Sequence, residues 1–162
     1  MTAPQHRRGH RLLAAVAVAT LALTSACTTG GWVPESPSAA GVQQQSGVVK
    51  ARNILLVADE SGDGALVGYL SASEAVELTG ATVAAIDAEG NPGEPVPVEV
   101  SGSVPRSGAL QLDGSNATVS GANLIPGLLA DVELAFDDGT RIRLQAPVMS
   151  AEHEDYSTVL EG

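Results

Sequence analysis

The sequence has 162 residues, with 19 acidic residues against 8 basic ones, and its formal net charge is −11 at pH 7. Because an acidic surface repels phosphate groups, this composition disfavours nucleic-acid binding and attraction to anionic lipid headgroups. The only aromatic residues are one Trp, two Tyr and one Phe, so Val, Leu, Ile and Ala are expected to form the core.

Residues 7–27 have the composition of a secretory leader. Three arginines lie within residues 7–11, and an uncharged, largely apolar run over residues 12–23 follows them. Small residues then lead to Cys27, the only cysteine. The apolar run is shorter than the ~20 residues that span a bilayer, and no basic stop-transfer cluster follows it. We therefore predict that residues 1–26 are a cleaved signal peptide.

The segment Ser25-Ala26-Cys27 resembles the end of a bacterial lipobox, in which the cysteine sulfur takes a diacylglycerol and the cysteine becomes the new N-terminus. That motif usually has leucine where this chain has Thr24. The alternative is ordinary cleavage after Ala26, which would release a soluble protein with a free thiol. We predict lipidation of Cys27, which would anchor the protein to the cell membrane on its extracytoplasmic face.

The chain after the leader divides into three predicted parts. Gly, Ser, Pro, Gln and Thr dominate residues 28–47, so the lipidated N-terminus over 27–47 is expected to act as a flexible tether without a strand. Residues 48–148 are expected to form the folded domain, and residues 149–162 an acidic tail. Loss of the leader leaves 8 − 3 = 5 basic residues against 19 acidic ones, so the mature chain has a net charge of −14.

Residues 48–148 contain short β-prone runs separated by clusters of Gly, Asp, Asn or Pro. About eight such runs predict an all-β domain, an antiparallel β-sandwich of the cupredoxin or immunoglobulin kind. The last two runs also predict how their residues pair across a hairpin. A three-residue loop with Gly139 in the left-handed conformation would pair Leu134 with Ile142 and Glu133 with Arg143, giving one apolar face and one charge-paired face.

One loop has the opening of a calcium-binding motif. Asp59, Ser61, Asp63 and Gly64 match the first ligand positions and the glycine of an EF-hand loop. The twelfth position is Leu70 instead of the bidentate glutamate, and β-prone runs flank the loop. We predict a turn between strands.

The mature chain carries few residues suited to catalysis or metal binding. His153, its only histidine, lies in the acidic tail, so we predict no catalytic residues and no enzyme activity. If the tail is helical, Met149 and His153 lie one turn apart and offer a thioether and an imidazole to copper(I). They are the weak metal candidates. The alternative is an edge methionine and a solvated histidine.

Residues 48–148 resemble the PCu(A)C-like copper chaperone family, in particular its lipoprotein branch from high-GC Gram-positive bacteria. The resemblance rests on the runs VVKARNILLVADESGDGALVGYLSA, ELTGATV and NATVSGANLIPGLLADVELAFDDGTRIRLQAPV. It implies a cupredoxin-like β-sandwich and delivery of copper(I) outside the cytoplasm through His and Met ligands that include an H-x-M motif. This chain has Asn116-Ala117-Thr118 at the place of that motif, so none of the family's ligands carries over.

Two functions therefore remain open. The first is a non-catalytic cell-envelope lipoprotein that has lost the family's metal site and engages an envelope protein partner or another ligand. The second is an extracytoplasmic copper carrier that uses Met149 and His153.

Overall fold

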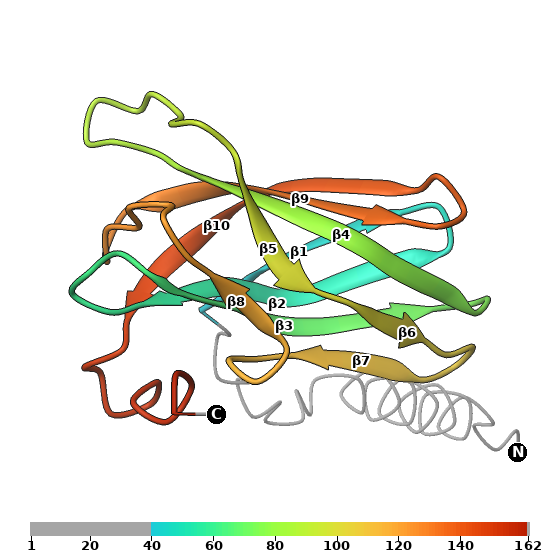
Figure 1. The fold of residues 1–162 in the computed structure, drawn as a ribbon. Coiled ribbons are helices and arrows are strands. Elements are labelled where there is room, and N and C mark those ends of the chain that lie inside the picture. The colour runs from blue at the N-terminus through green and yellow to red at the C-terminus, as the bar shows by residue number, and fades with distance from the viewer. Residues whose placement is uncertain (1–39, 162) are drawn as a thin grey trace, which may run out of the picture. The chain divides into compact units, whose positions relative to one another are not determined.

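The computed structural model describes residues 40–161, which form ten strands and, within that range, no helix (Figure 1). The predicted all-β class is confirmed. The strands are β1 (Val42–Ser46), β2 (Val49–Ala58), β3 (Gly64–Ala72), β4 (Val76–Ala85), β5 (Val96–Val100), β6 (Gly102–Val104), β7 (Ala109–Leu112), β8 (Ala117–Val119), β9 (Leu129–Phe136) and β10 (Arg141–Ser150).

Seven of the strands close a barrel in the order β2-β10-β9-β4-β5-β8-β3, with β3 pairing back onto β2. All pairs are antiparallel except β2 and β10, which run parallel where Leu56–Ala58 meets Val148–Ser150. β1, β6 and β7 extend this barrel by pairing with β2, β4 and β3. The sheet thus differs from the predicted eight-stranded antiparallel sandwich. The first long strand and the last strand meet side by side, and closure satisfies edges that a sandwich would leave open.

β1 lies inside the segment that was predicted to be an unstructured tether, so that prediction is wrong for Val42–Ser46. The sequence VQQQS has no apolar alternation of its own. It becomes a strand because the first half of β2 offers unpaired backbone groups, and Gln45 pairs with Lys50 across a tight turn at Gly47. The predicted signal peptide, Cys27 and residues 28–39 lie outside the described residues.

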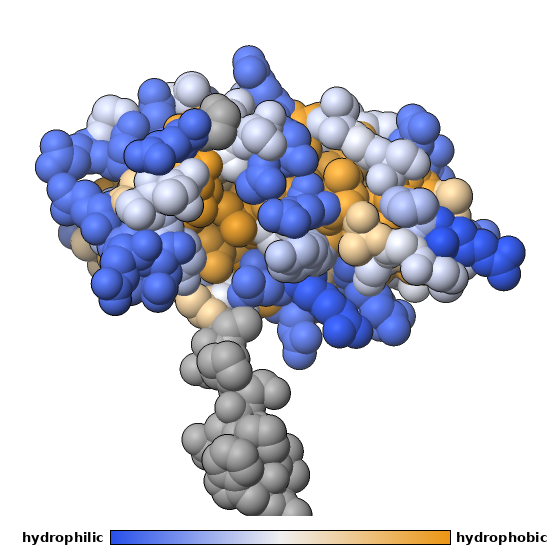
Figure 2. All heavy atoms as spheres, turned by 90° about the horizontal axis from the view of Figure 1, so that it is seen from below, coloured by the Kyte–Doolittle hydropathy of each residue, from blue (hydrophilic) through white to orange (hydrophobic). Residues whose placement is uncertain are grey.

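The core is aliphatic, as predicted. Its largest fully buried side chains include Ile54, Leu56, Leu66 and Leu134, and Phe136 is the single aromatic member of the buried cluster within residues 40–161. No polar or charged residue is buried in the described part of the chain. Figure 2 shows the molecule from below, where polar side chains cover most of the surface with apolar areas between them.

The β9–β10 hairpin has the predicted register. Leu134 pairs with Ile142 and Glu133 with Arg143. The loop closes through a hydrogen bond from the Gly139 amide to the Phe136 carbonyl at 3.1 Å, and Gly139 has a φ of 83°, in the left-handed region that glycine favours. This hairpin supplies two of the three strands beneath the candidate site.

The tail forms consecutive turns after β10, which continues to Ser150 and so passes the predicted domain boundary at Val148. The amides of His153, Tyr156 and Val159 each bond to a carbonyl three residues earlier. Near its end the tail lies against the β7–β8 turn, since a Cβ on Gly114 would stand 1.8 Å from the Val159 carbonyl oxygen. The tail therefore packs on the barrel as irregular structure, and it is not helical.

Candidate functional site

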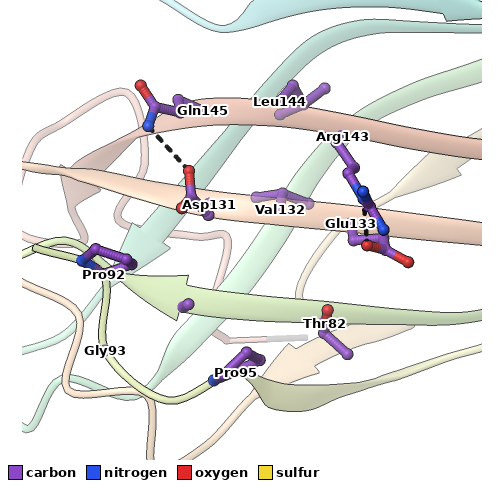
Figure 3. A pocket seen from close by; sticks show the side chains of 11 residues that line it. Thr82, Pro92, Gly93, Pro95, Asp131, Val132, Glu133, Arg143, Leu144 and Gln145 are labelled. Carbon is purple, nitrogen blue, oxygen red and sulfur yellow. Dashed lines mark hydrogen bonds and ion pairs between the residues drawn. The ribbon is translucent and has the colours of Figure 1, made fainter.

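A groove of about 520 Å³ lies on the outer face of the sheet formed by β4, β9 and β10 (Figure 3). Its floor consists of outward-pointing side chains in two rows across the three strands. One row holds Arg143, Glu133 and Thr82, and the next holds Gln145, Asp131 and Ala84. Because side chains alternate between the two faces of a strand, the register that buries Leu134 also places this polar set outside the barrel.

The loop between β4 and β5 forms the second wall of the groove and carries Pro92, Gly93 and Pro95. It folds back onto β4, where the Gly93 amide bonds to the Ala85 carbonyl at 2.8 Å. Under this wall Ala84 is only 5% exposed although it points away from the core. The wall is thus part of the fold, and it turns a flat sheet face into a concave one.

Asp87 holds the tip of this loop in shape. Its Oδ1 accepts hydrogen bonds from the backbone amides of Asn91 at 2.7 Å and Glu89 at 3.0 Å. The bond from the Asn91 backbone lowers the pKa of Asp87 below its ordinary value, with smaller contributions from the Asn91 side chain and from Glu89. An ionised Asp87 therefore favours the conformation that presents the two prolines to the groove.

Glu133, on the groove floor, forms two ion pairs. Its two carboxylate oxygens accept hydrogen bonds from Arg143 Nε at 2.6 Å and Arg141 Nη1 at 2.5 Å. The hydrogen bond from Arg143, followed by that from Arg141, lowers the pKa of Glu133 below its ordinary value of 4.5. In the adjacent row Gln145 Nε2 donates to Asp131 Oδ1 at 3.0 Å (Figure 3). The carboxylate of Glu133 is thus paired with two guanidinium groups, while that of Asp131 is bonded to a neutral amide.

Replacing Glu133 by glutamine is expected to change how stability depends on pH. The folded pKa of Glu133 is lowered, so the ion pairs stabilise the fold fully above the unfolded pKa and lose their effect as pH falls through the lower, folded pKa. Denaturant titrations should show Glu133→Gln less stable than the wild type at neutral pH, with the difference shrinking below pH 4.5. Glu99→Gln on β5 is the matched control. Parallel pH profiles for wild type and Glu133→Gln would contradict this assignment.

The groove combines two carboxylates, a guanidinium, an amide and a hydroxyl with an apolar wall of two prolines. A concave surface of this kind binds and orients a ligand through hydrogen bonds and apolar contact. None of the residues that line it is a histidine, cysteine or serine.

The structure does not place Met149 and His153 one helical turn apart. Met149 lies in β10 and pairs with Val57 of β2, and His153 lies in the turns that follow. His153 is exposed, and its Nδ1 accepts a hydrogen bond from the Asp155 amide at 3.3 Å while its ring contacts Tyr156 at a centroid distance of 5.8 Å. Within residues 40–161, no group of three or more His, Cys, Asp or Glu side chains is arranged to hold a metal ion.

Asn116, at the place of the family's H-x-M motif, stabilises the β7–β8 turn. Its Nδ2 donates to the Gln111 carbonyl at 2.9 Å, and its Oδ1 accepts from the Asp113 amide at 3.0 Å. Ala117 is fully buried, and Thr118 points outward from β8. Asn116 thus stabilises the turn, and Ala117 belongs to the buried core of the barrel.

The calcium-like loop is a turn between β2 and β3, as predicted. Asp59 Oδ1 accepts from the Ser61 amide at 2.8 Å and from the Ser61 hydroxyl at 2.6 Å, and the hydroxyl bond is the main cause of the lowered pKa of Asp59. Asp63 Oδ1 accepts from the Gly121 amide at 2.7 Å. The oxygens that suggested a cation site thus accept hydrogen bonds that stabilise two loops.

In the part of the chain that the structure describes, no helix is long and apolar enough to cross a membrane.

Comparison with solved structures finds similarity to PCuAC domains, the family that the sequence resembles. The copper-bound PCuAC domain from PmoF2 has a TM-score of 0.48 at 17% identity, covering 67% of this chain and 98% of that chain. The apo PCuAC domain from PmoF1 has a TM-score of 0.48 at 16% identity, covering 67% and 99%. The apo PmoF2 PCuAC domain has a TM-score of 0.47 at 15% identity, covering 69% and 98%. No protein-family model and no curated protein matches the sequence.

Sequence reasoning found part of the groove and missed the rest. The predicted hairpin register already placed Glu133 beside Arg143 on the outer face. The contribution of Thr82 and Ala84 depends on the pairing of β4 with β9, which joins segments far apart in the chain. A signal for the wall was present in the spacing of Pro92 and Pro95 around a glycine, but nothing local indicates that this loop folds back onto β4.

Proposed function

We propose that this protein is a non-catalytic binding module of the cell envelope. A lipid on Cys27 would hold it on the extracytoplasmic face of the membrane, and a copper-chaperone-like barrel without the family's metal site would engage a protein partner. The observation that carries the binding role is the groove on β4, β9 and β10. Its wall is fastened by Asp87 and its floor is ordered by the Glu133 ion pairs, so a partner meets a surface that is already formed.

A photo-reactive amino acid placed in the groove tests this role in intact cells. Thr82 points outward from β4 into the groove, and Thr118 points outward from β8, so the two exposed threonines are a matched pair. We expect illumination to give a discrete cross-linked adduct at position 82 and none at position 118. The adduct should weaken at least several-fold when Glu133→Arg disrupts the floor. Equal labelling at both positions, or labelling at neither, would overturn the groove as a binding site.

The second candidate function is an extracytoplasmic copper carrier. Its support is the sequence resemblance together with a half-buried thioether at Met149 and an exposed imidazole at His153. Anaerobic calorimetric titration of the mature chain with copper(I) decides between the two functions. Sub-micromolar binding that disappears in the Met149→Leu, His153→Gln double variant would favour the carrier. Absence of binding heat would remove it.

A further inference from the structure

The cations of this acidic protein are gathered on one side of the barrel. Residues 40–161 contain five Lys and Arg residues, and four of them are exposed on the outer faces of β2 and β10. They line three hollows that all share Gln45 of β1. We call this surface the basic face and define it as Lys50, Arg52, Arg141, Arg143 and Gln45.

The basic face keeps a positive charge after its ion pairs are counted. Arg141 and Arg143 share the single carboxylate of Glu133 and remain 60% and 75% exposed. Among the ion pairs of the described residues, none involves Lys50 or Arg52. These four cations and the one carboxylate that pairs with them sum to 4 − 1 = +3 on a chain whose total charge is strongly negative, and Asp138 lies at the edge of this surface, bonded to Thr140. The charge of the barrel is therefore unevenly distributed, so this one face differs from the overall composition, which disfavours attraction to anionic headgroups.

The chain enters the barrel at this same face. The Gly41 amide donates to Asn53 Oδ1 at 3.0 Å, and a Cβ on Gly41 would lie 2.4 Å from the Asn53 carbonyl carbon. The chain is thus pressed against β2 directly beside Arg52. Thirteen residues, 28–40, connect this point to Cys27, and at full extension such a segment spans no more than ~45 Å.

We propose that the basic face docks on the anionic headgroups of the membrane that holds the protein, a proposal that rests on the anchor at Cys27. A lipid on Cys27 would tether the barrel through the segment that joins it at the basic face. These cations would therefore be the charges nearest to the lipid. Exposed charges are screened beyond a Debye length of ~8 Å, so carboxylates on the far loops do not cancel the attraction. A short basic cluster combined with one covalent anchor is the usual two-signal arrangement for stable membrane association.

Docking in this orientation leaves the groove accessible only in part. Arg143 belongs both to the basic face and to the groove floor, whereas Pro92 and Pro95 stand on the opposite wall. The membrane would therefore lie along one rim of the groove. A partner would enter from the proline side.

The experiment uses the mature chain from Cys27 onward, coupled through its single thiol to a maleimide lipid in vesicles. Chemical coupling supplies the anchor, so the result does not depend on whether cells lipidate Cys27. Hydrogen exchange of the segment 42–52 is compared on phosphatidylcholine vesicles with and without phosphatidylglycerol. We expect exchange at least several-fold slower on the anionic vesicles, and we expect high salt to abolish this protection.

Two variants make the test specific to the basic face. Lys50→Gln with Arg52→Gln should remove the protection. Ser157→Glu with Thr158→Glu changes the net charge by the same amount on the exposed tail, which begins at the other end of β2, and should leave the protection intact. Equal exchange on both vesicle types would overturn the proposal, as would protection of the tail in place of segment 42–52. Either result would make an acidic protein the better candidate for this face.

Discussion

Replacing Leu134 by alanine is expected to lower the free energy of unfolding by about 2–5 kcal/mol, because it removes three side-chain carbons from a well-packed core. Leu134 is fully buried in β9, between Ala81 of β4 and Ile142 of β10. It therefore joins the three strands that carry the groove. Chemical denaturation of the mature chain measures the effect as a lower midpoint at an unchanged slope.

Leu129 offers a control in the same strand. It is 44% exposed, and Leu129→Ala is expected to change stability by less than about 1 kcal/mol. If the two alanine variants lost the same amount of stability, the inward-facing set of β9 would be wrongly assigned, and the outward position of Asp131 and Glu133 with it.

Gly64→Ala is expected to destabilise the barrel by about 1–3 kcal/mol, through a steric clash instead of a cavity. A Cβ at Gly64 would stand 2.1 Å from the Val57 carbonyl oxygen and 3.1 Å from the Ala58 Cα. Relief would require β3 to separate from β2 where Ala58 pairs with Gly64. The same denaturation measurement applies, and hydrogen exchange should show earlier opening at this end of the β2–β3 pair.

Gly80→Ala on β4 is the matched control. No atom lies within 4 Å of a Cβ built on Gly80, and alanine in a strand interior is more favourable than glycine by roughly 0.5–1 kcal/mol. We expect unchanged or slightly higher stability. Destabilisation by Gly80→Ala as large as by Gly64→Ala would show that close backbone approach is not what requires glycine at position 64.

Local sequence signals predicted the strands well and their long-range arrangement less well. The β9–β10 hairpin was predictable because Gly139 and the alternation of apolar and charged residues permit only one loop length that joins like faces. The parallel contact of Leu56–Ala58 with Val148–Ser150 was not predictable, because it joins the two ends of the domain and neither segment indicates its partner. Barrel closure, and hence the departure from a sandwich, follows from that contact.

The same reasoning explains the errors in the polar segments. Val42–Ser46 was predicted to be unstructured because three glutamines supply no apolar period, yet an unpaired edge of β2 is enough to make it a strand. A helical tail would place Met149 and His153 one turn apart, but β10 continues through Met149 because β2 pairs with it. In both cases pairing with β2 decided the structure, and local propensity did not.

The calcium-like pattern has a different role in the fold from the one it suggests. It consists of Asp59, Ser61, Asp63 and Gly64. The carboxylates of Asp59 and Asp63 accept hydrogen bonds from backbone amides, one within the loop and one from another loop. Gly64 permits close contact with the Val57 carbonyl. A cation would require these oxygens to converge on one point, but in the fold they accept separate hydrogen bonds. The prediction of a turn was confirmed for that physical reason.

The proposed function and the membrane-facing orientation both rest on the lipid at Cys27. Mass spectrometry of the N-terminal peptide from the membrane fraction measures it directly. We predict a peptide that begins at Cys27 and carries the added mass of a diacylglycerol on its sulfur. An unmodified Cys27 thiol on protein released into the medium would contradict the account.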